Sequence, residues 1–246
     1  MAERTALITG ASRGIGLGIA RLLARKGFGL TLGARDPDRL AAVTQGLLAL
    51  GSPEVICCSG DLADDSYSAR AAATHRGAFG AMNCLVLNAG VGTAGDIATF
   101  PRGRFEKTVA VNFSAAFALL QESLPLLRAG AARDLDRGAR IIALSSLTGV
   151  YPEPGLAVYG ATKAALISLI ATLNAEESIN GISGTAIAPG YVETDMSAWA
   201  QDRIPAREMI PVEDVVRIAE SLIDLSSRSV IPQIVMNRAG ASAFTA

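Results

Sequence analysis

Seven short apolar segments alternate with segments of helical character along this chain of 246 residues. The apolar segments span about residues 5–9, 28–33, 54–58, 82–88, 139–145, 183–188 and 231–236. Such alternation is typical of an α/β fold, because each helix carries the chain back across a face of a parallel sheet. We therefore expect a doubly wound parallel sheet of about seven strands with helices on both faces. Composition shifts nowhere sharply enough to mark a linker, so residues 1–246 predict one domain.

Composition and charge narrow the classes of function. Half of the residues are hydrophobic and 18% are charged, which is typical of a globular protein. The net charge of −1 gives no reason to expect nucleic acid or an anionic membrane as a partner. A strand pattern begins at residue 5 and leaves no room for a signal peptide, and we expect no apolar run long enough to span a bilayer. These features predict a cytoplasmic protein.

Cysteine and histidine usage excludes several kinds of site. Cys57, Cys58 and Cys84 lie in apolar segments without metal-site spacing, so we expect buried, reduced thiols. The single His75 lies in a polar helical stretch. One histidine excludes zinc sites built on several histidines and leaves a His-based catalytic triad without an obvious base. We expect no metal site.

A glycine-rich loop follows the first apolar segment and leads into a helical segment. Glycines let the backbone turn tightly and approach a pyrophosphate, while the helix N-terminus supplies free N–H groups and a positive dipole end. The alternative is a set of ordinary turn glycines, but the strand–loop–helix context favours a Rossmann-type dinucleotide site. The candidate binding residues in this loop are Gly10, Ser12, Arg13, Gly14, Ile15 and Gly16.

A second motif combines Ser146, Tyr159 and Lys163. Tyr159 and Lys163 are four residues apart, so on a helix predicted from about Ala157 to Asn180 they share one face. Ser146 ends the fifth apolar segment and can lie level with them. With 4 tyrosines and 3 lysines in the chain, chance gives about 0.05 such pairs. A surface Tyr and Lys on an ordinary helix is the alternative, and the serine and the glycine loop argue against it.

The order of these motifs closely resembles the short-chain dehydrogenase/reductase family over nearly the whole chain, in its compact branch of 3-oxoacyl-carrier-protein reductase-like and carbonyl reductase-like members. Shorter matches follow in the family's order, although Leu87 stands where a second asparagine is common. The tail 230–240 lacks the family's frequent Asp-Gly-Gly ending, and the loop 129–139 is longer than expected. The matching positions are Asp61 and Leu62 near the adenine, Asn88, Ala89 and Gly90 after the fourth segment, Asn112 in the active site, and Pro189, Gly190, Val192 and Thr194 beside the nicotinamide.

The resemblance implies hydride transfer between a nicotinamide and a carbonyl or secondary alcohol. Tyr159 is then the acid/base, and Lys163 lowers the pKa of its phenol and holds the nicotinamide ribose. A Lys⁺ some 4–5 Å away contributes roughly 3–4 kcal/mol, about the amount that a tyrosine needs to work near neutral pH. By resemblance, Ser146 orients the substrate oxygen, and Asn112 anchors a water that links Lys163 to solvent.

The choice of cofactor depends on the end of the second apolar segment. Asp36 is placed to bind the ribose hydroxyls of NAD, but it precedes Pro37 and is better explained as a helix cap. Ala34 occupies what looks like the usual acidic position. Arg13 and Arg35 form a plausible clamp for a 2′-phosphate, the alternative being two solvated surface arginines. We therefore expect NADP(H) to be preferred, with NAD(H) possible.

The substrate is not fixed by the sequence. The segments 147–157 and 191–210 are expected to face it, and packing of their aromatic side chains against the protein itself is the alternative. No basic cluster marks an acidic or acyl-carrier substrate, although Arg203 and Arg207 leave that open. The candidate contacts are Leu147, Tyr151, Tyr191 and Trp199.

Other classes of protein fit less well. A non-catalytic dinucleotide sensor would have no need of the Tyr–Lys pair, and a scaffold on the same fold remains an alternative. An epimerase or dehydratase usually needs a longer C-terminal region than the roughly 55 residues after Gly190.

The catalytic helix also predicts an oligomer. At 100° per residue, one side of the helix carries only the small residues Ala161, Ala165, Ser168 and Thr172. Either another helix of the same chain covers this side or a second subunit does. The family resemblance favours a homodimer or homotetramer.

Overall fold

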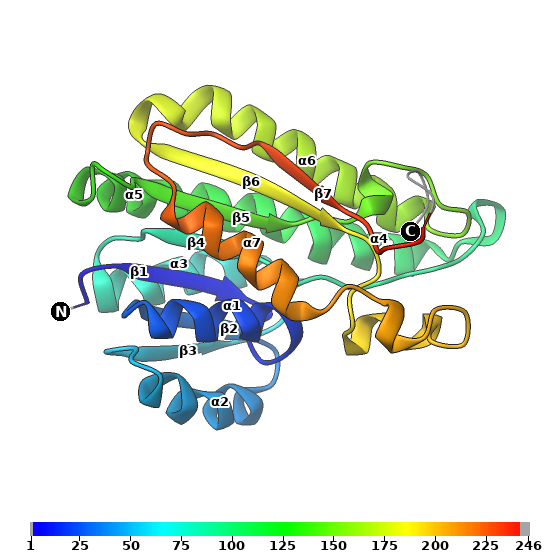
Figure 1. Ribbon diagram of the computed structural model, residues 1–246, viewed down its shortest axis with the longest axis horizontal. Coiled ribbons are helices and arrows are strands. Elements are labelled where there is room, and N and C mark those ends of the chain that lie inside the picture. The colour runs from blue at the N-terminus through cyan, green and yellow to red at the C-terminus, as the bar shows by residue number, and fades with distance from the viewer. Residues whose placement is uncertain (1, 242–246) are drawn as a thin grey trace.

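The computed structural model describes residues 2–241 as a parallel sheet between two layers of helices (Figure 1). All neighbouring strands pair in parallel, in the order β3-β2-β1-β4-β5-β6-β7. The predicted α/β, doubly wound fold is therefore confirmed, and each strand lies within about two residues of its predicted segment. The strands are β1 Thr5–Thr9, β2 Gly29–Ala34, β3 Val55–Ser59, β4 Cys84–Leu87, β5 Ala139–Leu144, β6 Ile182–Pro189 and β7 Gln233–Met236.

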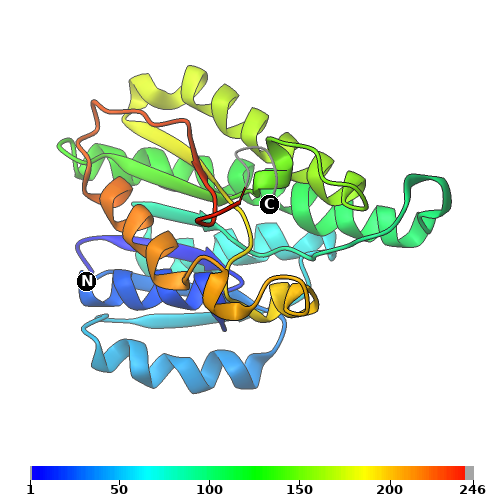
Figure 2. The same cartoon turned by 45° about the vertical axis from the view of Figure 1, so that its right-hand side comes forward.

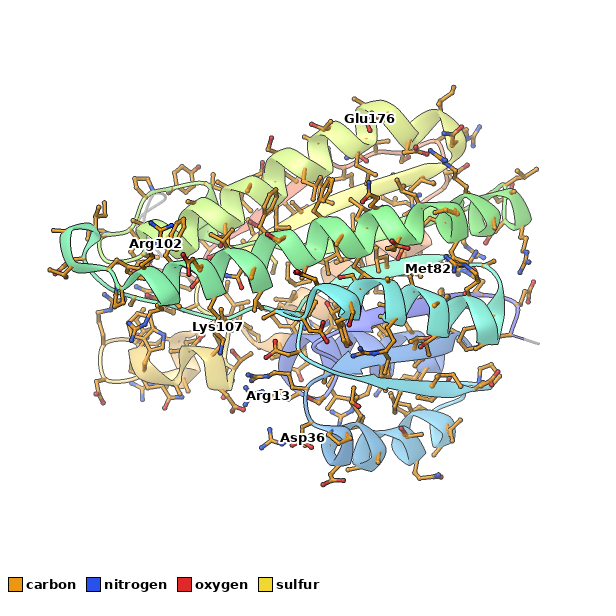
Figure 3. The ribbon with its side chains drawn as sticks, turned by 180° about the vertical axis from the view of Figure 1, so that it is seen from behind. Arg13, Asp36, Met82, Arg102, Lys107 and Glu176 are labelled. Carbon is orange, nitrogen blue, oxygen red and sulfur yellow. The ribbon has the colours of Figure 1, made fainter. Side chains whose placement is uncertain are left out.

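Two hydrophobic cores lie on the two faces of the sheet. One joins the sheet to α1, α2 and α7, and the other joins it to α3, α5 and α6, seen from behind in Figure 3. Strands β1, β4, β5 and β6 are buried along their whole length, as expected for the centre of a sheet covered on both faces. The helices are α1 Gly14–Arg25, α2 Pro37–Ala49, α3 Asp65–Phe79, α4 Arg102–Val109, α5 Ala115–Arg133, α6 Ala157–Glu177 and α7 Val212–Asp224.

Local sequence signals explain several helix ends. The Asp36 side chain accepts hydrogen bonds from the backbone N–H groups of Asp38 and Arg39, and Pro37 is the first residue of α2. The predicted helix cap is confirmed. Gly27 follows α1 in the left-handed region, with φ of +75°, where a side chain would be strained.

The segment from α4 to α5 differs from its prediction. Five residues of π-helix, Ala110–Ser114, join the two α-helices, and α5 continues to Arg133. The predicted loop 129–139 is wrong, because residues 129–133 are helical and only 134–138 connect to β5. Ala131 packs in the core on one face of the sheet, which stabilises the helical turn despite Gly130 and the polar residues from Asp134 onward.

Two helical stretches pass a test of length and composition for spanning a bilayer, a test that helices packed on a sheet, as both are here, also pass. They are Arg102–Arg133 and Ala157–Asn180, and only 44% and 39% of their most apolar windows are buried within the chain. Both stretches lie side by side on one face of the sheet and carry residues of the site described below (Figure 3). Part of their apolar surface is therefore left uncovered by the described residues.

Two of the residues singled out by the sequence lie elsewhere than expected. Cys57 is exposed, whereas Cys58 and Cys84 are buried free thiols. His75 lies in α3 but is fully buried, because α3 packs this side of the helix against the sheet. Hydrogen bonds to both ring nitrogens satisfy the buried side chain. One ring nitrogen lies 2.9 Å from the Thr31 hydroxyl and the other 3.0 Å from the Ala81 carbonyl oxygen. Burial lowers the pKa of His75 to about 4.

This buried histidine predicts loss of stability in mild acid. Its pKa is about 4 in the folded protein and about 6.5 in the unfolded chain, so between these values the unfolded state binds the extra proton. The free energy of unfolding should fall as pH drops from about 6.5 to 4, by about 3 kcal/mol from this group. Urea denaturation of the wild type and of His75→Gln across that range measures it. An equal pH dependence in the two proteins would contradict the assignment.

Candidate active site

A large cavity opens at the carboxyl ends of the strands where the sheet order reverses between β1 and β4, the usual place for a ligand in a doubly wound sheet. Its volume is about 440 Å³. Every residue expected to bind the dinucleotide lines it except Gly16, which is buried behind the loop: Gly10, Ser12, Arg13, Gly14, Ile15, Arg35, Asp61, Leu62, Asn88, Ala89, Gly90, Tyr159, Lys163, Pro189, Gly190, Val192 and Thr194.

The glycine loop is fixed from below by β4. The Asn88 side chain donates hydrogen bonds to the carbonyl oxygens of Thr9 and Gly10, at 3.0 and 3.2 Å. The Thr9 hydroxyl in turn accepts hydrogen bonds from the backbone N–H groups of Asn88 and Ala89. A Cβ atom on Gly16 would lie 2.3 Å from the Gly10 carbonyl oxygen and 2.5 Å from the Asn88 amide nitrogen. Glycine is thus required for the contact of loop, helix and strand.

The start of α1 fits an anionic ligand. Its N-cap residue Arg13 makes no side-chain capping bond, and no acidic residue lies in the first turn. The N–H groups at this helix end therefore have no side-chain partner where they face the cavity. The Arg13 guanidinium instead forms an ion pair at 2.6 Å with Asp195, across the mouth of the cavity.

The proposed catalytic side chains come from β5 and α6 and meet at the inner end of the cavity. Ser146 follows β5, and Tyr159 and Lys163 lie on successive turns of α6. The Lys163 ammonium donates a hydrogen bond of 2.7 Å to the Leu144 carbonyl oxygen, and the Ser145 hydroxyl donates one to the Lys163 carbonyl oxygen. These two bonds fasten the catalytic turn of α6 to the end of β5.

The electrostatics of the pair differ from the expectation. Burial raises the pKa of Tyr159, and the hydrogen bond with Ser146 opposes that shift without cancelling it. Burial also lowers the pKa of Lys163 to about 8. The expected lowering of the tyrosine pKa by Lys163 is therefore absent from the protein alone. The lysine nitrogen lies over the phenol ring, 5.6 Å from its centroid, and the loss of solvation outweighs its charge.

Asn112 lies in the π-helical segment and is buried. Its side-chain oxygen accepts a hydrogen bond from the Val91 N–H, and its amide nitrogen donates to the Val91 carbonyl oxygen and to the Thr162 hydroxyl. The side chain therefore connects three segments around Lys163. Its expected water contact stays a prediction, and most of its hydrogen-bonding capacity is used within the protein.

A second cavity, of about 280 Å³, adjoins the first. Tyr191 and Trp199 line it as expected for substrate contacts. Leu147 and Tyr151 are not among the residues that line it, and their assignment as substrate contacts stays a prediction. Leu147 is 1% exposed because it turns inward in the short 3₁₀ helix after Ser146, and Tyr151 lies beyond that turn. Ser146 and Tyr159 line both cavities.

The sequence analysis missed several lining residues. Lys107 and Val111 line the larger cavity (Lys107 is labelled in Figure 3). Their i, i+4 spacing puts both side chains on one face of the helix, and that spacing is the signal in the sequence that could have found them. Glu153 lines the smaller cavity. It lies within the segment 147–157 that was expected to face the substrate, and its negative charge in that segment is the signal that could have found it.

Comparison with known proteins gives a consistent result. The sequence profile described as short chain dehydrogenase matches residues 4–204. A D-β-hydroxybutyrate dehydrogenase of Rhizobium meliloti is 33% identical over 195 residues, which cover 78% of this chain and 73% of the relative. A 3-oxoacyl-(acyl-carrier-protein) reductase of Staphylococcus epidermidis is 31% identical over 215 residues, covering 86% of this chain and 85% of the relative.

Solved structures agree with these matches. A short chain dehydrogenase of Burkholderia cenocepacia in complex with NADP is 30% identical, with a TM-score of 0.82 and 97% of each chain covered. A 3-oxoacyl-(acyl-carrier protein) reductase of Brucella melitensis in complex with NAD is 29% identical, with a TM-score of 0.84 and coverage of 95% and 94%.

Proposed function

The chain belongs to the short chain dehydrogenase family, and from that membership we propose a site in which Tyr159 is the acid/base of the reaction. As a member, the protein is an NAD(P)-dependent oxidoreductase that transfers a hydride between a nicotinamide and a carbonyl or secondary alcohol. The bound dinucleotide supplies or accepts the hydride. What remains is the work of this chain's own residues.

One observation carries the assignment: the two cavities meet at Ser146 and Tyr159. A compound in the smaller cavity can place its oxygen beside both hydroxyl groups while its carbon faces the larger cavity. Ser146 then holds the oxygen by a hydrogen bond, and Tyr159 donates or accepts the proton. Among the described residues that line both cavities, Tyr159 is the only one with a titratable side chain. The Lys163 ammonium lines the larger cavity alone and is bound to the Leu144 carbonyl oxygen.

The raised pKa of Tyr159 fits the role of proton donor. A phenol that stays protonated at neutral pH can give its proton to the alkoxide oxygen formed in carbonyl reduction. Oxidation of an alcohol needs the deprotonated phenol instead, which positive charge in the cavity would favour. Lys163, with its pKa lowered to about 8, is still mostly charged at pH 7 and supplies part of that charge.

We infer that NADP(H) is the preferred cofactor. Asp36 is occupied as the cap of α2 and does not line the cavity, which argues against a role in binding ribose hydroxyls. Arg13, Arg35 and Lys107 all line it. Among the described residues Arg35 forms no ion pair, so its charge is available to a 2′-phosphate. Arg13 would exchange Asp195 for the phosphate.

A charge reversal tests this preference. In Arg35→Asp, and more strongly with Arg13→Ala added, NADPH affinity should fall at least about tenfold relative to NADH affinity, because the 2′-phosphate loses its charge partner. The dissociation constants of the two cofactors measure the ratio. Arg39→Asp is the matched control, since Arg39 pairs with Asp36 outside the cavity. An unmodified protein that already prefers NADH would show that Asp36 has been misread.

The uncovered side of α6 and the composition of the chain lead to a proposal on its assembly and location. We propose that residues 1–246 act as a single dinucleotide-binding unit of a cytoplasmic homodimer or homotetramer, acting on a small-molecule carbonyl or alcohol. In support, Ala161, Ser168 and Thr172 on α6 are exposed and Ala165 is half-buried, so no helix of this chain covers the small-residue side. The aromatic rings of Phe105 and Phe117 are also about half exposed on the neighbouring helices. We propose no nucleic acid or membrane partner, because the net charge of −1 gives no attraction to a polyanion.

Two arginines on the uncovered side of α6 test the assembly. Ala165→Arg with Ser168→Arg should give monomers or insoluble protein, because bulk and charge prevent close helix contact. Sedimentation at micromolar concentration measures the change. The matched control is Ala41→Arg with Gln45→Arg on the exposed side of α2, which should leave the assembly intact. A wild-type protein that is strictly monomeric would contradict the proposal.

Loss of one hydroxyl tests the chemistry. Tyr159→Phe should lower turnover about a thousandfold with any accepted ketone, while NADPH still binds, because only the proton donor is lost. Steady-state NADPH oxidation and cofactor titration measure the two effects. Tyr151→Phe, outside both cavities, should turn over normally. Wild-type turnover in Tyr159→Phe would refute the assignment.

A further inference from the structure

The smaller cavity has an acidic wall and no basic one. Among the described residues that line it, Glu153 is the only one with a charged side chain. The remaining lining residues are small, apolar, aromatic or hydroxyl-bearing. A compound that reaches Ser146 and Tyr159 therefore shares a confined space of about 280 Å³ with one carboxylate.

Glu153 lines the cavity, and its contacts link the cavity wall to the protein surface. Its Oε1 atom accepts hydrogen bonds from the Tyr191 hydroxyl at 2.9 Å and from Arg203 Nη2 at 3.3 Å. The Glu153 side chain is 14% exposed, whereas that of Arg203 is 60% exposed and does not line the cavity. The ion pair thus has its negative end at the cavity wall and its positive end in solvent, where screening weakens it.

The second carboxylate oxygen strengthens this polarity. Glu153 Oε2 is buried and accepts no hydrogen bond from the described residues. Among the described residues only the groups bonded to Oε1, the Tyr191 hydroxyl and the Arg203 guanidinium, compensate the charge of this carboxylate. Burial, together with the hydrogen bond to this carboxylate and its charge, raises the pKa of the adjoining Tyr191 to about 12, so that this hydroxyl stays neutral.

Arg203 is held against the protein beside the cavity and is not among the residues that line it. Its Nη2 atom donates to the Tyr191 hydroxyl at 2.8 Å as well as to Glu153. Its guanidinium carbon lies 5.6 Å and 5.9 Å from the ring centroids of Tyr191 and Trp199. Arg207, the other arginine of this segment, is exposed and pairs with Glu208 at 3.5 Å. Neither arginine supplies the cation that a carboxylate in the cavity would need.

We propose that Glu153 determines specificity by charge: the cavity takes uncharged ketones or secondary alcohols and rejects carboxylates. The proposal rests on the proposed function of Tyr159 and concerns the substrate class alone. It separates this chain from the relative of Rhizobium meliloti named for hydroxybutyrate, a carboxylate whose charge lies two carbons from the reacting one. A carboxylate of that length bound at Tyr159 would share the cavity with the Glu153 carboxylate, and no lysine or arginine among the described lining residues would offset the repulsion.

A matched pair of substrates tests it. With NADPH, 4-hydroxy-2-butanone and acetoacetate have similar size and the same reacting ketone, but only acetoacetate is an anion. The wild type should favour the neutral compound at least about tenfold in kcat/KM. Glu153→Gln keeps the shape and should reduce that preference at least about tenfold, through faster reduction of acetoacetate. Glu208→Gln, which removes the same charge outside both cavities, should leave the ratio unchanged.

A variant with the opposite effect guards against misfolding. Arg203→Met removes the outer cation and should increase the preference for the neutral compound. Equal kcat/KM values for the two compounds in the wild type, or an unchanged ratio in both variants, would overturn the proposal.

If neither compound is reduced, their equilibrium binding to the protein–NADPH complex decides. A preference for the neutral ligand that Glu153→Gln abolishes supports the charge selection and places the failure in the Tyr159 chemistry. Equal binding of the two ligands, or no binding of either, overturns the proposal itself.

Discussion

The contact between the ends of β1 and β4 is the constraint on which the rest of the site depends. There the sheet order reverses, and the glycine loop must lie close enough to β4 for the Asn88 amide to bond the carbonyl oxygens of Thr9 and Gly10. A single added Cβ at Gly16 would collide with the Gly10 carbonyl oxygen and with the Asn88 amide nitrogen. The same contact turns the start of α1 toward the cavity, so packing and dinucleotide binding are served by one arrangement of backbone.

A second connection places the chemistry at the other end of that cavity. The Lys163 ammonium donates to the Leu144 carbonyl oxygen and the Ser145 hydroxyl donates to the Lys163 carbonyl oxygen, so two hydrogen bonds join the end of β5 to α6 just before Ser146. Asn112 adds the π-helical turn between α4 and α5 to the same cluster. A π-helical turn in a long helix is frequent at functional sites, because the extra residue reorients side chains that a regular helix would direct elsewhere.

The sequence predicted the α/β fold class, the strand segments, the glycine loop and the spacing of Tyr159 and Lys163, because these depend on periodicity and local backbone chemistry. It failed where tertiary packing decides. Residues 131–133 after Gly130 fold as helix because Ala131 packs in the core, and only the polar residues from Asp134 onward leave it. Leu147 turns inward in a 3₁₀ helix that no sequence pattern predicts. The role of Glu153 was equally hidden, since only the fold shows that its partner Arg203 lies outside the cavity.

The environment of Tyr159 and Lys163 favours proton donation over proton abstraction. Burial raises the pKa of Tyr159 and lowers that of Lys163 to about 8, so the phenol stays protonated at pH 7 while the ammonium stays mostly charged. The lysine nitrogen lies 5.6 Å from the centre of the phenol ring, where its charge favours the phenolate, but burial outweighs it. In the proposed mechanism a positively charged oxidised nicotinamide in the larger cavity would add a second positive charge, so oxidation of an alcohol by Tyr159 would depend on the cofactor more strongly than reduction of a ketone does.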